Sequence, residues 1–238
     1  MGLRYAILLK YGIPLMERKI IITEDGSHTV SIQEMGVTYH SIHGAIQESE
    51  HVFIEAGLSY VSGHPGIQDI SIFEVGFGTG LNALLTYIES EKKKLKIYYE
   101  TIEPFPLNEE EVQSLNYCQQ LNRPDLQFTF EQLHSSDYEK EIQFPPFFIL
   151  KKSKADLSTF KTSDLFDLIY FDAFDPNVQP ELWTKEVFEK LFSILEPNGI
   201  LVTYSSKGDV RRALRSAGFT VEKIPGPKGK REMIRAKK

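Results

Sequence analysis

The sequence contains few of the residues that crosslink a chain or anchor it in a membrane. Among its 238 residues there is one cysteine, Cys118, which excludes an internal disulfide and a zinc site built from cysteines. No apolar run approaches the ~20 residues that a membrane-spanning helix needs. The N-terminal apolar stretch is too short for a signal peptide, and no small-residue cleavage site follows it. These absences predict a soluble, cytoplasmic protein that makes no membrane contact.

Signatures of several enzyme classes are missing as well. The six histidines show no spacing typical of a metal site, so the sequence predicts no bound metal. It contains no serine–histidine triad, P-loop or zinc-protease motif. With 41% hydrophobic and 25% charged residues, the composition is ordinary for a globular chain with one large α/β domain and room for a small extension.

Charge is distributed unevenly along the chain. The net charge of −6 argues mildly against a nucleic-acid partner. From Lys207 to the C-terminus, however, eleven Lys and Arg residues stand against three Asp and Glu residues, a local charge of +8. Such a segment is either a solvated tail, which is the usual meaning of a charge run, or a phosphate-binding surface.

The first quarter of the chain has the pattern of a β-rich region. Four short strands are expected there, at Arg18–Thr23, His28–Gln33, Val37–Ser41 and His51–Ala56. The first two flank Asp25-Gly26, a strong hairpin signal. We therefore predict a β-rich N-terminal extension at residues 1–62 and a main domain at residues 63–238.

In the main domain, strands alternate with helices. Strands are predicted at Asp69–Val75, Leu95–Ile102, Phe147–Lys152, Phe166–Asp172 and Ile200–Tyr204, and helices at Leu81–Glu91, Leu107–Gln120, Pro180–Leu195 and Val210–Ala217. Leu126–Phe130 is either a strand or part of a helix that reaches His134. Phe219–Ile224 and Arg231–Ala236 are expected to form an antiparallel pair. The alternation predicts a doubly wound, Rossmann-like α/β fold with a parallel sheet.

A glycine-rich motif follows the first strand of this domain. Glu74-Val-Gly-Phe-Gly-Thr-Gly-Leu-Asn82 closes a strand and opens a helix, and its glycines allow a ligand to approach the backbone. A dinucleotide fingerprint needs a small residue at position 81, which is leucine here, so a diphosphate cofactor is not favoured. Glu74, just before the glycines, suits a cofactor that carries a cationic amino group.

Acids after the next two strands complete a cofactor pattern. Glu103 ends the second strand, where an acid binds ribose hydroxyls. Asp156 follows the third strand and is placed to accept a hydrogen bond from an adenine amino group, a role that Asp137 takes if Leu126–Phe130 is the third strand. The pattern matches S-adenosyl-L-methionine better than a nicotinamide dinucleotide. The expected cofactor-binding residues are Glu74, Gly76, Phe77, Gly78, Gly80, Asn82, Glu103 and Asp156.

An aspartate ends the clearest strand of the chain. Asp172 follows a near-continuous apolar run, so it is expected at the carboxyl edge of the sheet. There it would lie beside the methyl group that S-adenosyl-L-methionine donates. Methyl transfer to an amine needs a free lone pair and leaves positive charge on nitrogen. A carboxylate orients the amine, accepts its proton and stabilises the ammonium, so Asp172 is the predicted catalytic residue. Phe174, Pro176 and Trp183 are expected to form an apolar wall for a planar base, with helix packing as an equal alternative for Trp183.

Several motifs together resemble the methyltransferase domain of the MnmC family. They are Glu74-Val-Gly-Phe-Gly-Thr-Gly-Leu-Asn82, Glu103-Pro-Phe-Pro-Leu107, Asp172-Ala-Phe-Asp-Pro176, Gln179-Pro-Glu-Leu-Trp-Thr184, Thr203-Tyr-Ser-Ser206, Val210-Arg-Arg-Ala-Leu214, Ala217-Gly-Phe219 and Gly229-Lys-Arg-Glu-Met233. The resemblance extends from about Arg18 to the end and includes Tyr39-x-Ser41. Asp175 departs from it, since the family usually has alanine there, and Met1–Leu15 resembles nothing that we can place.

The resemblance implies a class I S-adenosylmethionine-dependent methyltransferase that N-methylates the 5-aminomethyl group of a tRNA wobble uridine, often 2-thiolated. The implied product is 5-methylaminomethyl-(2-thio)uridine. The tRNA would be bound by Tyr204 and by a basic C-terminal face that comprises Arg211, Arg212, Lys230 and Arg231. Because the chain ends shortly after Met233, we expect the stand-alone form, to which a separate oxidoreductase or aminomethylating enzyme supplies the amine. Met16 is a candidate for the natural start.

Two other functions stay open at this point. A small-amine transferase related to the aminopropyltransferases would hold a polyamine between Asp172 and Asp175. A non-catalytic RNA-binding protein on the same fold would bind no cofactor, and the intact glycine motif and Asp172 count against it. The basic C-terminal segment favours tRNA over a polyamine, although the choice of substrate depends mainly on the resemblance.

Overall fold

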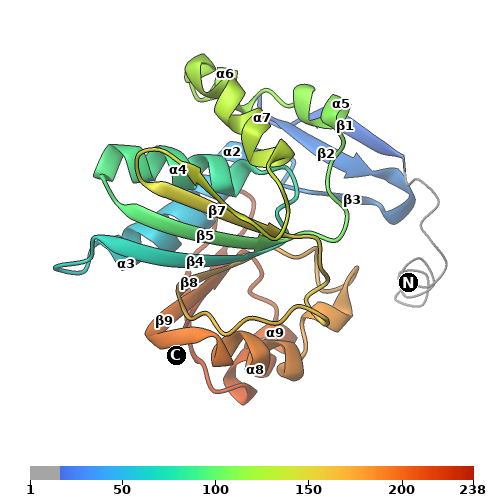
Figure 1. The fold of residues 1–238 in the computed structure, drawn as a ribbon. Coiled ribbons are helices and arrows are strands. Elements are labelled where there is room, and N and C mark those ends of the chain that lie inside the picture. The colour runs from blue at the N-terminus through green and yellow to red at the C-terminus, as the bar shows by residue number, and fades with distance from the viewer. Residues whose placement is uncertain (1–16) are drawn as a thin grey trace.

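The computed structural model describes residues 17–238, which form a small and a large β-sheet (Figure 1). The small sheet is antiparallel and comprises β1 (Arg18–Ile22), β2 (His28–Ile32) and β3 (Val37–Thr38). In the turn between β1 and β2, the Asp25 carboxylate accepts the Ser27 backbone N–H at 3.0 Å, as is common for aspartate in a turn. The expected β-rich start is confirmed here, whereas Met1–Leu15 and Met16 lie outside the described residues.

The large sheet has eight strands in the order β10-β11-β9-β8-β4-β5-β7-β6. In chain order they are β4 (Asp69–Val75), β5 (Lys96–Ile102), β6 (Glu141–Phe144), β7 (Phe148–Ser153), β8 (Phe166–Phe171), β9 (Leu195–Thr203), β10 (Thr220–Pro225) and β11 (Glu232–Lys237). The five central strands, β9 to β7 in the sheet order, are parallel, and β10 and β11 pair antiparallel as expected. The Rossmann-like α/β prediction is confirmed, while the antiparallel edge strand β6 is an addition.

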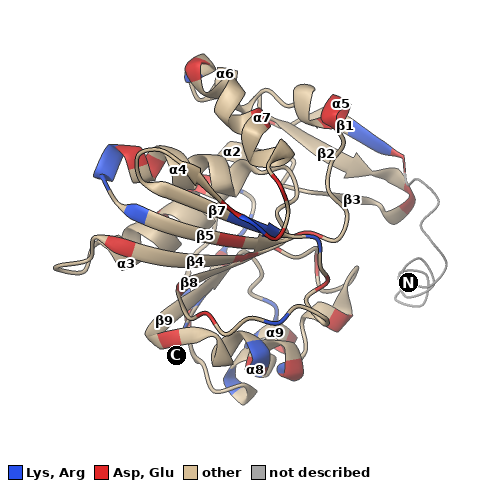
Figure 2. Cartoon of the chain, viewed as in Figure 1, with Lys and Arg blue, Asp and Glu red and all other residues tan. Residues whose placement is uncertain are grey.

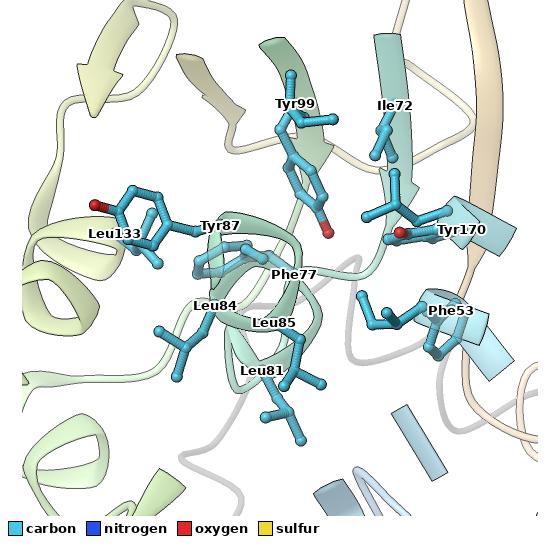
Figure 3. Close-up of a cluster of buried hydrophobic side chains, with 14 of the residues drawn as sticks. Phe53, Ile72, Phe77, Leu81, Leu84, Leu85, Tyr87, Tyr99, Leu133 and Tyr170 are labelled. Carbon is cyan, nitrogen blue, oxygen red and sulfur yellow. The ribbon is translucent and has the colours of Figure 1, made fainter. Parts of the chain in front are cut away.

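Helices cover both faces of the large sheet. Successive strand residues point to opposite faces, so Ile72 belongs to one core cluster and Phe73 to the other. The first cluster packs α4 (Leu81–Lys93) and α7 (Gln127–Ser135) against the sheet, as the close-up of Figure 3 shows for the α4 residues around Leu84. The second cluster packs α8 (Lys185–Ser193) and α9 (Gly208–Ser216) on the opposite face (Figure 1).

The strand expected at His51–Ala56 is wrong. Here α2 (Ala45–Ser49), the π-helical η2 (Glu50–Ser59) and α3 (Tyr60–Ser62) form one continuous helical stretch. Its β-branched and aromatic residues are buried against β8 and β9 rather than in a strand ladder. Gly57 lets the helix lie close to the sheet, because a Cβ there would be 3.1 Å from Val202. The predicted division at residue 62 assigns this stretch to the extension, although its side chains pack on the large sheet.

Two helix predictions need smaller revisions. The helix expected at Leu107–Gln120 is divided into α5 (Glu109–Gln113) and α6 (Tyr117–Gln120). Between them, the Asn116 side chain binds the β1–β2 hairpin through the Gly26 carbonyl and the His28 N–H, at 3.0 and 2.8 Å. Similarly, η4 (Pro180–Leu182) and α8 replace the single helix expected from Pro180. Of the two alternatives for Leu126–Phe130, the helix that reaches His134 is confirmed as α7 with the preceding turn η3 (Pro124–Leu126).

Candidate active site

A cavity of about 410 Å³ lies where β4, β5 and β8 end. In a parallel α/β sheet, ligands bind at this edge, because the loops that leave the strands diverge there. Residues of the small sheet, Arg18 and Ile32, and of the segment that follows it, Tyr39 and His40, also line the cavity. The walls also contain backbone or side chains of Gly76, Phe77, Gly78, Glu103, Asp156, Asp172 and Phe174.

The glycine-rich loop between β4 and α4 has a backbone that other residues rarely adopt. Gly76, Gly78 and Gly80 have φ angles of 91°, 51° and 72°. A Cβ on Gly76 would be 2.9 Å from the Asp172 carbonyl oxygen, so glycine is also required sterically. Gly76 and Gly78 line the cavity, whereas Gly80 does not and lies instead against the His134 ring. Two of the three glycines are therefore placed for a close backbone approach to a ligand.

Glu103 lies beside this loop, on the cavity wall. Its two carboxylate oxygens accept the backbone N–H groups of Gly78 and Phe105 at 2.9 and 2.8 Å. Burial raises the pKa of the carboxyl, and these two hydrogen bonds oppose that shift. The carboxylate is thus fixed at the end of β5, with further acceptor capacity for hydroxyl groups of a ligand in the cavity.

Of the two candidate adenine-binding acids, Asp156 lines the cavity and Asp137 does not. The third parallel strand of the large sheet along the chain is β7, and Asp156 follows it as expected. Its Oδ1 atom accepts the Ser158 N–H at 2.7 Å. Asp137 is exposed and forms an ion pair with Lys140 at 2.7 Å. The geometry therefore favours Asp156 for a contact with a ligand in the cavity.

Glu74 and Asn82 lie beneath the cavity and do not line it. Glu74 is fully buried and accepts hydrogen bonds from Asn82 Nδ2 at 3.1 Å and from Thr101 Oγ1 at 2.9 Å. Burial, together with the charge of Asp172, raises its pKa to about 8. Because neither side chain lines the cavity, direct contacts of Glu74 and Asn82 with the cofactor stay a prediction that this placement does not favour.

Asp172 follows β8 and reaches the cavity from its floor. Its Oδ2 atom accepts a hydrogen bond from Asn82 Nδ2 at 2.9 Å, so one amide group bridges Asp172 and Glu74. Burial, followed by the nearby charge of Glu48, raises the pKa of Asp172 to about 7. A carboxyl group with this pKa both takes up and releases a proton near neutral pH, as acid–base chemistry at a reacting amine requires.

The four apolar or aromatic residues expected at the substrate have different positions. Phe174 lines the cavity, and its ring meets Tyr39 edge to face at a centroid distance of 5.1 Å. Trp183 is buried against Phe171 and donates its indole N–H to the Phe174 carbonyl at 2.8 Å. Tyr204 and Pro176 are likewise outside the lining, so Phe174 alone of the four faces the cavity. Trp183 has the packing role that the sequence left as its alternative.

The predicted basic face contains residues in different environments. Arg212 is exposed and pairs with Asp209, Arg231 is exposed, and Arg211 is partly buried. Lys230 is instead engaged with Glu48 at 2.7 Å. Figure 2 also shows basic segments on β1, on β7 and at the end of α4, so positive charge is not confined to the C-terminal quarter. Asp175, the departure from the family pattern, forms an ion pair with Lys207 at 2.6 Å and does not line the cavity.

Sequence reasoning missed the contribution of the N-terminal segment to the cavity. His40 is buried and lies 2.6 Å, Nε2 to Oγ1, from Thr79 of the glycine-rich loop. Burial lowers the pKa of His40 to about 4, so the ring is neutral at physiological pH and holds the loop by a hydrogen bond without charge. Tyr39 packs over Gly78, where a Cβ would be 3.0 Å from its ring. Only the family resemblance at Tyr39-x-Ser41 pointed to this segment.

Two further classes of site were searched for among residues 17–238. No group of three or more His, Cys, Asp and Glu side chains there is arranged to hold a metal ion. No helix within the same range is both long and apolar enough to cross a membrane.

Comparisons with known proteins agree with this geometry. A family model described as "S-adenosyl-L-methionine-dependent methyltransferase" matches residues 137–238. The MnmC bifunctional proteins of tRNA 5-methylaminomethyl-2-thiouridine biosynthesis from Leptospira interrogans and from Azoarcus sp. BH72 are 33% and 30% identical to the chain. The alignments cover 82% and 94% of this chain, but only 32% and 36% of those relatives. The chain thus spans about a third of their length.

A solved structure is similar over almost the whole chain. The crystal structure of MnmC2 from Aquifex aeolicus superposes with a TM-score of 0.72 at 25% sequence identity, and covers 99% of this chain and 77% of that one. At this coverage the superposition includes the small N-terminal sheet as well as the large sheet. Taken with the cavity at the strand ends, it shows that the chain belongs to the S-adenosyl-L-methionine-dependent methyltransferases, in the family of the methyltransferase domain of MnmC.

Proposed function

We propose that the protein N-methylates the 5-aminomethyl group of (2-thio)uridine at the tRNA wobble position and so forms 5-methylaminomethyl-(2-thio)uridine. The observation that carries the proposal is Asp172, a partly buried carboxyl that lines the cavity next to the glycine-rich loop. The names of the MnmC relatives, which refer to biosynthesis of this nucleoside, support the choice of substrate. Methyl transfer does not create the aminomethyl group, so an oxidoreductase or an aminomethylating enzyme must act before it.

The cavity residues fit S-adenosylmethionine as the methyl donor. In the proposal, the amino-acid end and the sulfonium lie along Gly76, Phe77 and Gly78, where the absence of side chains on two residues allows close approach. Glu103 accepts hydrogen bonds from the ribose hydroxyls, and Asp156 accepts one from the adenine amino group. Glu74 and Asn82 act indirectly, because they hold Asp172 from below.

The chemistry required of the protein is mainly control of one proton. When bound, S-adenosylmethionine supplies an electrophilic methyl group on a positively charged sulfur. The substrate amine arrives protonated, and Asp172 accepts one proton from it so that the nitrogen lone pair is free. Transfer of that methyl group to the freed nitrogen would leave a positive charge on the methylated amine. Asp172, once it has returned its proton to water, stabilises that charge.

The substrate side of the cavity fits a planar base. The rings of Phe174 and Tyr39 meet at its wall, and Trp183 fixes the backbone of Phe174 through its indole N–H. Arg211, Arg212 and Arg231 are proposed to contact tRNA phosphates near the site. The polyamine alternative loses its second carboxylate, because Asp175 is paired with Lys207 outside the cavity lining.

The test is transfer of labelled methyl groups from S-adenosylmethionine to tRNA taken from a strain in which the corresponding gene is deleted. Mass spectrometry of nucleosides should show loss of 5-aminomethyl-(2-thio)uridine and gain of its methylated form, and the deletion strain should accumulate the unmethylated nucleoside. Label in polyamines but not in tRNA would reject the proposal. Absence of any S-adenosylhomocysteine binding would indicate the non-catalytic alternative.

A further inference from the structure

A partly buried ion pair joins the β10–β11 turn to α2, and both of its charges act on Asp172. Lys230, in the turn between β10 and β11, places its Nζ atom 2.7 Å from Glu48 Oε1 of α2. The Glu48 side chain is only 8% exposed. Removing one partner of such a pair leaves an uncompensated charge with little access to water, so the two residues act as one electrostatic unit.

This ion pair is connected to the backbone at Asp172. Lys230 Nζ lies 3.9 Å from the centroid of the Tyr204 ring, a cation–π contact. The Tyr204 hydroxyl donates to the Ala173 carbonyl, next to Asp172, at 2.8 Å. On the other side, the second carboxylate oxygen of Glu48 accepts the Ser41 N–H at 2.7 Å. Segments near residues 40, 204 and 230 thus meet at the ion pair, which Tyr204 connects to Ala173, the residue after Asp172.

The two charges of the pair act on Asp172 in opposite directions. Burial is the largest influence on its pKa, the negative charge of Glu48 raises it further, and the positive charge of Lys230 lowers it. The other titratable groups that face Asp172 are Glu74 of β4, Tyr99 of β5 and Tyr204 after β9. None of these three lines the cavity, and Tyr204 is itself in contact with Lys230.

We propose that Lys230 and Glu48 are positioning residues that jointly set how readily Asp172 takes up the proton of the substrate amine. Their opposite charges partly cancel at Asp172, which can change its protonation state near neutral pH. The inference deepens the proposed function, on which its catalytic meaning depends. It also gives Lys230 a role other than the tRNA phosphate contact expected from the sequence.

The direct test measures the titration of the Asp172 carboxyl by carbon-13 NMR, with Asp172→Asn used to assign the signal. Lys230→Met keeps an unbranched stem over Tyr204 but leaves Glu48 unbalanced, so the titration midpoint should rise by about 0.5 to 1 pH unit. Glu48→Gln leaves Lys230 unbalanced, so the midpoint should fall by about the same amount. The double variant should return close to the parent.

Lys228→Met is the matched control. Lys228 belongs to the same turn and pairs with Glu24 at 3.0 Å, so its loss also loosens the turn from the N-terminal segment. It should leave the Asp172 midpoint unchanged. Shifts in the same direction for Lys230→Met and Glu48→Gln, or no shift in either, would overturn the inference.

A second measurement separates this inference from the proposed function. The acid limb of the pH profile for methyl transfer to tRNA should move up in Lys230→Met and down in Glu48→Gln. If the NMR midpoints move as expected but even the parent does not methylate tRNA, the substrate proposal fails and the inference stands. If Lys230→Met instead weakens tRNA binding and its salt dependence without moving the midpoint, Lys230 is a phosphate contact and the inference fails.

Discussion

The cofactor side and the methyl-transfer side of the cavity are built in different ways. On the cofactor side, Gly76, Gly78, Glu103 and Asp156 follow three strands that are adjacent in the sheet, in chain order. On the methyl-transfer side, Asp172 is surrounded by groups from the N-terminal segment, from α4 and from the β10–β11 turn. The first side therefore depends on local backbone geometry, whereas the second depends on contacts between segments that are far apart in sequence.

The two sides of the cavity should therefore respond differently to substitution. Damage to the cofactor side should reduce affinity for the cofactor, because the loop backbone itself forms the contact. Damage to the methyl-transfer side should reduce turnover, or shift its pH dependence, while cofactor affinity is retained. The following four predictions test this comparison, from the largest expected effect to the smallest.

The largest effect is expected for Asp172→Ala. Loss of the proton acceptor should lower kcat by about 100-fold or more, while affinity for S-adenosylhomocysteine stays within about tenfold of the parent. Single-turnover kinetics and calorimetric titration measure the two quantities separately. Equal losses of turnover and cofactor affinity would show that Asp172 has a structural role and that the two sides are not separable.

Asp172→Asn should increase stability at neutral pH. The folded-state pKa of Asp172 is raised to about 7, above its ordinary value of 3.8. At a pH between these two pKa values, the Asp172 carboxyl is deprotonated in the unfolded chain but protonated in the folded protein. The parent therefore loses stability as the pH rises through this window, by up to about 4 kcal/mol. The variant lacks this effect. Thermal melting at pH 4, 6 and 8 should show an advantage of the variant that grows with pH.

Asp137→Asn serves as the control for that experiment. Asp137 is exposed, and its ion pair with Lys140 lowers its pKa, so its removal should cause at most a small loss of stability. A pH-independent difference between Asp172→Asn and the parent would mean that folding does not raise the pKa of Asp172.

Gly76→Ala should affect the cofactor side most. A side chain at a φ of 91° is strained, and its Cβ would be 2.9 Å from the Asp172 carbonyl oxygen. We expect a loss of stability of about 1–3 kcal/mol and cofactor affinity lower by about tenfold or more. Gly66→Ala is a matched control with a φ of 85° and open space around its Cβ, so it tests backbone strain alone. Equal cofactor affinity in both variants would contradict the assigned loop contact.

The smallest effect is expected from the arginines of the basic C-terminal face. Single Ala substitutions of Arg211, Arg212 and Arg231 should each weaken tRNA binding a few-fold and lower its salt dependence by about one counterion, with unchanged cofactor affinity. Binding measured by filter retention at several salt concentrations tests this. Unchanged tRNA binding at low salt in the triple variant would remove the basic face from the account.

Much of the fold was predictable because local patterns determine it. The apolar runs of β4 and β8 and the Asp-Gly hairpin gave the elements that the structure shows. The strand expected at His51–Ala56 failed because β-branched and aromatic residues there are buried in a helix against the sheet. The helix from Leu107 was divided because Asn116 binds the β1–β2 hairpin, a contact that spans about ninety residues of sequence.

The candidate site was predictable to the extent that it follows strand ends. Gly76, Glu103, Asp156 and Asp172 were all expected at the carboxyl edge of the sheet and line the cavity there. The sequence could not show that Glu74 does not line the cavity. Its distance from the glycines along the chain is the same whether its side chain lies in the cavity wall or behind it. Nor could it show Tyr39 or the Lys230–Glu48 pair, because no periodicity relates segments that meet only in three dimensions.

The most direct test of the central claim is a crystal structure with S-adenosylhomocysteine bound. We predict that the nucleoside occupies the cavity, with its ribose at Glu103, its adenine near Asp156 and its sulfur directed toward Asp172. The same site should be occupied in crystals of Asp172→Asn. A crystal in which S-adenosylhomocysteine is bound elsewhere and this cavity is empty would contradict the account. So would a complex in which the sulfur points away from Asp172.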